Sequence, residues 1–116
     1  GGQPVINGNG LQTRDYVYVG DVVRANLKAL DYKGNDYFNI GTGIETNVNE
    51  LFHQINHLTN ANAKEAHGPA QPGEQLRSVL NNHKAKSILG WTPQVSLKEG
   101  LANTVEFFRN YFNMTQ

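Results

Sequence analysis

Residues 7–19, Asn-Gly-Asn-Gly-Leu-Gln-Thr-Arg-Asp-Tyr-Val-Tyr-Val, decide how the chain begins to fold. The two Asn-Gly steps at 7–10 supply positive φ at little cost, which is typical of a tight turn between two strands. Extended pieces flank the turn at Pro4–Ile6 and Leu11–Val19. The pattern therefore predicts a hairpin-like start.

A helix is predicted directly after this stretch. Asp21 offers a carboxylate to the free amides of a helix that runs to about Leu30. The apolar side of this helix consists of Val22, Val23, Leu27 and Leu30. Such a side has to pack against something.

The last helix has the strongest signal. Ser96 and Glu99 stand at capping-box spacing before it. One face carries Leu97, Leu101, Val105, Phe108 and Phe112. Gly100 interrupts this helix at a cost of about 0.5–1 kcal/mol relative to Ala, so we expect a close backbone contact there.

The segments between these two helices are predicted from shorter patterns. A helix is expected from about Val48 to Leu58, and a short one after Asn81-Asn82 that ends at Gly90. Short strands are expected at 37–40 and 76–80, and an irregular loop at 60–73 with an extended piece near Ala66. The fold class is thus α/β, with short strands and about four helices.

Composition excludes several classes of function. Of the 116 residues, ten are Lys or Arg and ten are Asp or Glu, so the net charge is zero and neither nucleic acid nor a membrane is expected as partner. The chain has no Cys, which removes thiolate chemistry and fits a cytoplasmic protein. The length suits one domain, residues 1–116. The start at Gly1, without an initiator Met, leads us to expect a cut boundary.

Two patterns suggest ligands and have simpler explanations. His53 and His57 have the spacing of a shared metal, but Gln54 stands where zincins need Glu, so two solvated imidazoles are the favoured interpretation and no metal site is predicted. The segment Gly41-Thr42-Gly43 stands before a predicted helix, where amides can hold phosphate. Two glycines are too few for a dinucleotide fingerprint, and a tight turn is favoured.

Two charged side chains have open interpretations. Arg14 follows the Gly-rich turn, where a guanidinium can bind a diphosphate through two hydrogen bonds. The simpler alternative is a surface ion pair of Arg14 with Asp15 or Asp21. Glu74 can accept from ribose hydroxyls or serve only as a turn carboxylate.

Taken together, the segments resemble the second half of the extended short-chain dehydrogenase family, the NAD-dependent epimerases and dehydratases of nucleoside-diphosphate sugars. The match covers almost the whole chain in the family's order and includes Gly8–Val19 (GDGxQTRDFVYV), Asp21–Ala25, Phe38–Gly43 (FNIGTG), Pro72–Ser78 (RPGExxRS), Lys84–Pro93 (SKAKxxLGWxP) and Ser96–Leu101 (SLEEGL).

The resemblance implies a sugar-nucleotide site most like that of a UDP-glucose or UDP-N-acetylglucosamine 4-epimerase. By that likeness Arg14 binds the diphosphate, Tyr16 and Val48 line the nucleotide, and Glu74 takes the ribose hydroxyls. Gln71 stands where the family usually has a second phosphate-binding Arg. Because a charge-assisted hydrogen bond is worth roughly 1.5–3 kcal/mol against about 1 for a neutral one, affinity could fall severalfold.

The resemblance also implies what this chain does not hold. The glycine fingerprint for NAD and the catalytic Tyr-xxx-Lys pair are not in this sequence, so NAD is implied only for a full-length parent enzyme and catalysis by this chain alone is not expected. We therefore expect a C-terminal fragment without a complete Rossmann domain. The alternative is a free-standing non-catalytic binding or oligomerisation module, and exposed apolar helix faces would favour a homodimer.

Overall fold

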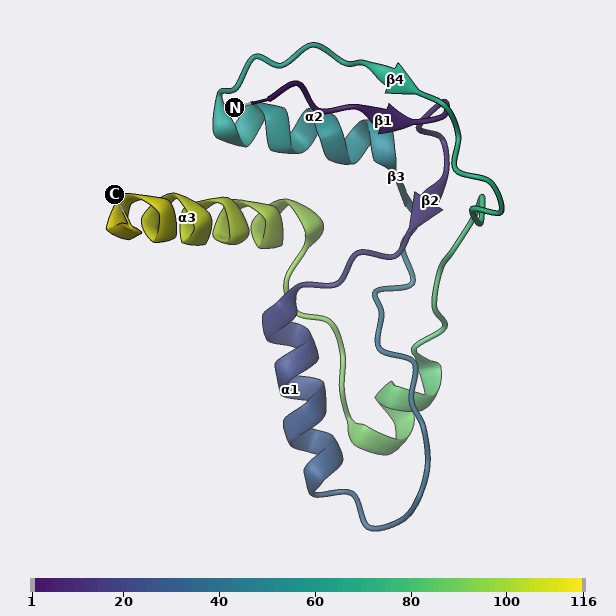
Figure 1. Ribbon diagram of the computed structural model, residues 1–116. Helices are drawn as coiled ribbons and strands as arrows, with labels where there is room; N and C mark the ends of the chain where they lie inside the picture. The colour runs from purple at the N-terminus through teal and green to yellow at the C-terminus, as the bar shows by residue number, and fades with distance from the viewer. Residues whose placement is uncertain (1, 116) are drawn as a thin grey trace.

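The computed structural model describes residues 2–115. In chain order, this part contains β1 (Ile6–Asn7), β2 (Thr13–Arg14), α1 (Val19–Leu30), β3 (Thr46–Asn47), α2 (Val48–Thr59), β4 (His67–Gly68), the short π-helical stretch η1 (Ala85–Leu89) and α3 (Leu97–Thr115). Figure 1 shows α2 and α3 side by side at one end of the molecule, while α1 runs away from them beside η1. The α/β class and the predicted second helix are confirmed.

The predicted hairpin at the start is wrong. Strand β1 pairs in parallel with β4, and β2 pairs antiparallel with β3, so the two strands beside the turn have different partners. The turn does not fold back because it contacts the start of α2 instead. The amide of Asn49 donates to the carbonyl of Gly10, whose φ is 73°. A Cβ on Gly10 would lie 1.9 Å from the Asn49 side chain, so only glycine fits there.

The predicted strands at 37–40 and 76–80 are also not formed. Neither segment has a strand neighbour within the described residues, and the carbonyl of Leu76, which lies at a bend, accepts one backbone hydrogen bond from the amide of Thr13. A strand exists through its ladder to a neighbour, so propensity alone cannot produce one. In the first segment, Phe38 and Ile40 still pack toward the core while Tyr37 and Asn39 are exposed.

Helix α1 begins at Val19, two residues before the predicted cap. Its N-cap residue is Tyr18, and no side chain caps the helix. Asp21 is buried in the first turn, where its carboxylate accepts the amides of Gln94 and Val95 from the segment before α3. The sequence suggested a local cap, whereas the carboxylate joins two distant segments.

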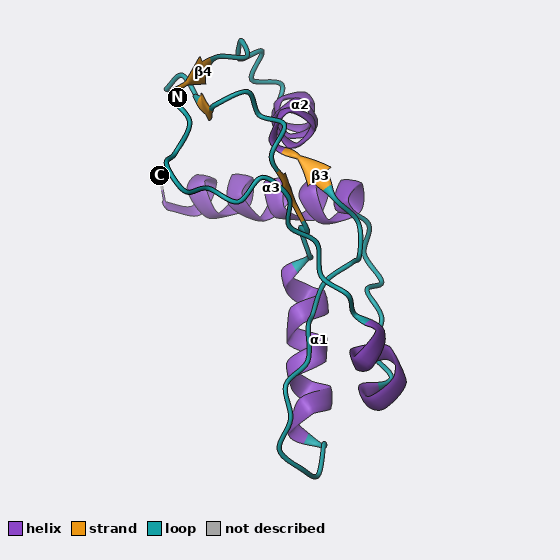
Figure 2. Ribbon diagram, turned by 90° about the vertical axis from the view of Figure 1, so that its right-hand side faces the viewer, coloured by secondary structure: helices purple, strands orange, loops and turns teal. Residues whose placement is uncertain are grey.

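A small core surrounds Trp91. Ala25, Ala85 and Trp91 are buried, and Val17, Phe38, Ile40 and Leu89 pack against them. The indole Nε1 donates to the carbonyl of Asp21 at 2.9 Å, and the Arg24 guanidinium lies 5.8 Å from the ring centre. This cluster fixes α1 to η1, the two helical segments at the lower end of Figure 2.

Helix α3 starts as predicted. The Ser96 hydroxyl accepts the amide of Glu99 at 3.2 Å. Gly100 is buried, and a Cβ there would lie 3.1 Å from Cδ1 of Tyr18. The expected close contact at Gly100 is therefore confirmed, and its partner is an aromatic ring rather than another backbone.

The molecule is open for its size. Its accessible surface is 8262 Å², whereas a monomer of 12.9 kDa exposes roughly 6300 Å². The radius of gyration is 16.8 Å, against about 13 Å for a compact domain of this length. Much of the extra surface is apolar, because the outward side of α1 has Val23, Leu27 and Leu30 exposed by 51, 59 and 81 %.

Candidate functional site

The centre of the candidate site is an ion pair between two distant segments. Arg14 leaves β2, and its Nη2 lies 3.2 Å from Oε1 of Glu74. Nη1 of Arg14 donates to the carbonyls of Thr13 and Gln75 at 2.6 and 2.7 Å. The two charged side chains are about 30 % exposed. Both alternative partners considered for Arg14, Asp15 and Asp21, are wrong.

This pair retains capacity for a ligand. A guanidinium has five N–H donors, and the recorded bonds of Arg14 use three of them. Two donors therefore remain for an incoming anion. On Glu74, the recorded hydrogen bond and ion pair both involve Oε1, which leaves Oε2 as an acceptor.

The Gly41-Thr42-Gly43 turn does bind an anionic group, and that group belongs to the chain itself. The carboxylate of Asp15 accepts the amides of Thr42, Gly43 and Leu80 and the Thr42 hydroxyl. Burial raises the pKa of Asp15, but these hydrogen bonds outweigh it and hold the pKa below its usual value. Because the amides are used, a phosphate role for this turn is not supported.

Tyr16 lies beside the ion pair. Its pKa is raised, first by burial, with the positive charge of Arg14 lowering it and the negative charge of Glu74 raising it. The ring also lines two pockets, of about 610 and 210 Å³, that share the segment before α3. Arg14 and Glu74 line neither of these pockets, and their side chains are partly buried.

The two remaining predicted site residues lie on either side of this region. Val48 is half-buried at the first position of α2, and its amide donates to the carbonyl of Gln12. Gln71 is exposed, and its carbonyl accepts the amide of Glu74, which fixes the turn that presents the carboxylate. The side chain of Gln71 has no recorded contact with Arg14 within residues 2–115.

A second ion pair, which the sequence did not single out, supports β2. Arg77 donates from Nε and Nη2 to both oxygens of Glu45, at 2.9 and 2.6 Å, and the hydroxyl of Thr13 donates to the same carboxylate. Hydrogen bonds from Arg77 and then Thr13 lower the pKa of Glu45 to about 2. The Arg-Ser pair at 77–78 was the available signal, but its acidic partner is 32 residues away.

The two histidines on α2 do not form a shared site. His53 Nε2 lies 2.9 Å from Oε1 of Glu65, while His57 has no recorded side-chain contact within the described residues. No group of three or more His, Cys, Asp or Glu that could hold a metal ion is found in residues 2–115.

Short strands, four helical segments and an Arg–Glu pair beside a tyrosine define the class of protein to which this chain belongs. Residues 1–104 match the family model described as GDP-mannose 4,6 dehydratase. The chain belongs to this family of NAD-dependent nucleotide-sugar epimerases and dehydratases, and it matches the C-terminal part of their structures.

Individual relatives and solved structures are similar to this chain over most of its length. The putative UDP-glucose 4-epimerase of Methanocaldococcus jannaschii is 49 % identical over 92 % of this chain and 34 % of the relative. The crystal structure of UDP-glucose 4-epimerase from Thermotoga maritima with UDP-glucose is 46 % identical, covers 93 % of this chain and 36 % of that one, and has a TM-score of 0.87. The structure of an epimerase from Methanothermobacter thermautotrophicus is 32 % identical, and the match covers 97 % of this chain and 34 % of that one with a TM-score of 0.92.

The share of the relatives that is covered limits what can be transferred. This chain spans about a third of their length, and residues 2–115 do not form a complete Rossmann domain. Within the described residues, no helix has both the length and the apolar character that a membrane span requires.

Proposed function

We propose that this chain is the part of an NAD-dependent nucleotide-sugar 4-epimerase or dehydratase that binds the sugar nucleotide, with a UDP-sugar as the ligand. The observation that carries the proposal is the meeting of Arg14 and Glu74 across sixty residues of sequence. A guanidinium with two unused donors suits a diphosphate, which presents several charged oxygens. Glu74 adds a carboxylate oxygen within reach of the same ligand.

The roles follow the chemistry of each group. Arg14 contacts the diphosphate, Glu74 accepts from the ribose hydroxyls, and the Tyr16 ring and Val48 line the nucleotide. Gln71 offers an amide where a charged donor would bind more strongly, so the diphosphate rests mainly on Arg14. The Glu45–Arg77 pair keeps β2 in place from the other side.

The reaction itself belongs to a longer polypeptide in this proposal. NAD supplies hydride acceptance and return, and no residue of this chain is assigned to it. Proton transfer at the sugar hydroxyl needs a base of tuned pKa, and that role is assigned to no residue of this chain. The part described here holds and orients the nucleotide end of the substrate.

Calorimetric titration with UDP-glucose tests this role. We expect heat of binding for the wild-type chain and an affinity lower by roughly tenfold to a hundredfold in Arg14→Ala, because one charge-assisted contact is worth about 1.5–3 kcal/mol. The matched control is Arg109→Ala, which removes an equal charge from α3, where Arg109 bonds only the carbonyl of Leu58 in the recorded contacts. Equal affinity in both variants, or no heat at millimolar ligand, would contradict the proposal.

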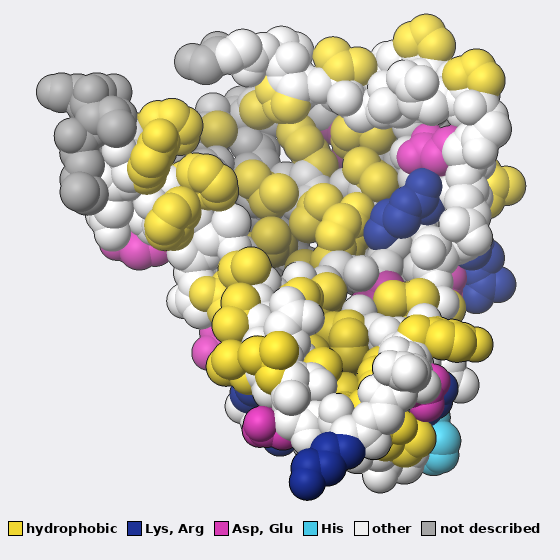
Figure 3. All heavy atoms as spheres, turned by 60° about the horizontal axis from the view of Figure 1, so that its bottom comes forward, with side chains coloured by type: hydrophobic (Ala, Val, Ile, Leu, Met, Phe, Trp, Pro, Cys, Tyr) yellow, Lys and Arg dark blue, Asp and Glu magenta, His cyan; other side chains and the backbone are white. Residues whose placement is uncertain are grey.

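A second candidate function, an oligomerisation module, is favoured by the exposed apolar surface. Figure 3 shows hydrophobic side chains gathered over the face that runs from α1 toward α3. A pocket of about 610 Å³ lies here, lined mainly by apolar groups of residues 16–19 and the first turns of α3. The surface in excess of a compact monomer, roughly 2000 Å², exceeds the roughly 800 Å² that one partner buries in a stable complex.

Light scattering across a concentration series tests self-association through this face. We expect a dimer mass that reverts to a monomer in Leu27→Lys, because a charge on the α1 stripe is costly to bury. Leu11→Lys is the matched control, since Leu11 is equally exposed but lies in the turn region away from α1. A monomer mass for the wild type at every concentration would rule out the homodimer.

A further inference from the structure

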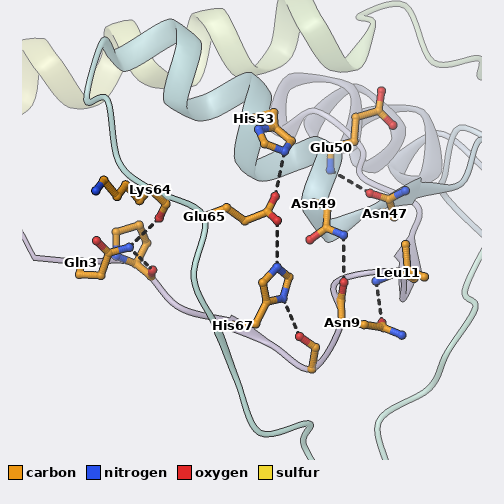
Figure 4. A network of polar contacts seen from close by, with 12 residues as sticks. Gln3, Asn9, Leu11, Asn47, Asn49, Glu50, His53, Lys64, Glu65 and His67 are labelled. Atoms are coloured by element: carbon orange, nitrogen blue, oxygen red, sulfur yellow. Dashed lines mark hydrogen bonds and ion pairs between the residues drawn. The ribbon is translucent and has the colours of Figure 1, made fainter.

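The ring of His67 is held between two acceptors. Its Nδ1 lies 2.6 Å from the carbonyl oxygen of Gly8, and its Nε2 lies 3.0 Å from Oε2 of Glu65 (Figure 4). A carbonyl and a carboxylate can only accept hydrogen bonds. A neutral imidazole has one N–H and can satisfy only one of them, so this geometry requires the doubly protonated ring.

The ring joins two segments that the backbone already brings together. β1 and β4 pair over two residues each, and the amides of Ile6 and Gly8 donate to the carbonyls of Ala66 and Gly68. A ladder this short is marginal in water. The imidazolium adds a side-chain bond across the same pair of segments, from Nδ1 to the Gly8 carbonyl, while its contact with Glu65 lies within one segment and holds the ring in place.

These two segments lead directly to the proposed ligand groups. The turn at Gly8 precedes β2, which carries Arg14, while the chain after Gly68 leads through Gln71 to Glu74. If β1 and β4 separate, the segments that carry the Arg14 guanidinium and the Glu74 carboxylate are no longer held together at this end. The Arg14–Glu74 pair follows the Gly8–His67 contact by six residues in one segment (8 to 14) and by seven in the other (67 to 74).

The charged groups around His67 are few. Glu65 contacts the ring from the segment before β4, and His53 on α2 reaches the other oxygen of Glu65 at 2.9 Å. The turn after β1 presents the Gly8 carbonyl, and β1 itself has no ionisable side chain. Lys64 and Glu50 appear in the same view, where the Lys64 carbonyl accepts from Gln3 and the Glu50 amide donates to Asn47.

We propose that His67, as an imidazolium bonded to Gly8 and Glu65, is a positioning residue for the sugar-nucleotide site that joins the segment of Arg14 to the segment of Glu74. This inference rests on the proposed function. His67 and Glu65 would act on the site without touching the ligand.

The sign of the pH dependence follows from both partners. The hydrogen bond to Glu65, and then the one to Gly8, raises the pKa of His67 above 6.5, so the contact is complete below 6.5 and is lost as the pH rises through the raised value. The pKa of Glu65 is lowered from 4.5, chiefly by the hydrogen bond from His67, so on the acid side the contact is lost as the pH falls through that lowered value. The contact is therefore strongest between about pH 5 and 6.5.

Histidine NMR on the whole chain tests the contact itself. We expect the pKa of His67 to fall in Glu65→Gln, and the amides of Ile6 and Gly8 to lose protection several-fold in His67→Gln at pH 6. His57→Gln is the matched control, because His57 lies on α2 without a recorded side-chain contact in the described chain. A His67 pKa that stays the same in Glu65→Gln overturns the proposal.

Binding of UDP-glucose from pH 5.5 to 8.5 tests the positioning role. This ligand suits the measurement because its diphosphate is a diester that does not titrate in the range. We expect wild-type affinity to fall several-fold as His67 loses its proton, and His67→Gln to show a weak affinity without this slope. An unchanged slope in His67→Gln overturns the positioning role. If no variant binds at all, the proposed function fails and the role falls with it, while the NMR result still decides whether the contact exists.

Discussion

The Trp91 cluster and the Arg14–Glu74 pair are held together by different means. Around Trp91, buried aliphatic and aromatic groups exclude water, and the indole N–H is satisfied by the Asp21 carbonyl. Around Arg14, side chains about 30 % exposed are held by ion pairs and backbone carbonyls. The first region is complete within this chain. The second is stabilised by polar contacts that an incoming ligand can supplement, which is what a binding site needs.

The largest effect on stability should come from a substitution in the Trp91 cluster. Trp91→Ala removes a fully buried indole and leaves the Asp21 carbonyl without its donor, so we expect a loss of about 3–5 kcal/mol in the free energy of unfolding. Urea denaturation followed by circular dichroism measures it. Phe107→Ala, at a position 62 % exposed on α3, is the control and should cost much less. Similar losses in both variants would mean that the Trp91 cluster is not the core.

A smaller effect is expected at the contact between Tyr18, just before α1, and Gly100 on α3. Tyr18 lies between Gly20 and Gly100, and a Cβ on Gly100 would approach the ring at 3.1 Å. This approach is tighter than an ordinary van der Waals contact, so the ring has to shift by a few tenths of an ångström. Gly100→Ala should therefore destabilise the chain by about 1 kcal/mol, despite the better helix propensity of alanine.

The thermal midpoint of Gly100→Ala checks this expectation, and the double variant Tyr18→Ala/Gly100→Ala provides the control. Without the ring, the alanine at 100 should become neutral or stabilising relative to Tyr18→Ala alone. A stabilised single variant would show that the contact at Gly100 is loose.

The smallest effect concerns the exposed pair that supports β2. The pKa of Glu45 is held at about 2, below its ordinary 4.5, so the pair contributes above pH 4.5 and is lost as the pH falls toward 2. Arg77→Ala should raise the pKa of Glu45 toward 4.5 but not fully, because the Thr13 hydroxyl still donates. Carboxyl-carbon NMR titration measures this shift, and Arg109→Ala should leave it unchanged.

Features set by local sequence were predicted well. The cap at Ser96 and the bounds of α2 depend on neighbours within a few residues. The close contact at Gly100 was predicted because a glycine inside a helix is otherwise unfavourable. The Asn81 side chain accepts the amide of His83, as its position near a helix start suggested.

Features set by distant neighbours were not predicted. Asp21 was predicted as a local cap, but the two amides that donate to its carboxylate lie 73 and 74 residues further along the chain. Asp15 likewise binds a turn that lies 27 residues further along. The segments at 37–40 and 76–80 have the composition of strands and no neighbour to pair with in the described chain. For the site, resemblance named Arg14 and Glu74, whereas their direct contact and the role of His67 required the structure.

The ring of Tyr18, the residue before α1, lies against Gly100 of α3 and lines the groove beside that helix. The apolar stripe of α1 and the groove therefore meet at one side chain. A partner that covers both surfaces would contact this ring, so a substitution at Tyr18 would alter both surfaces at once.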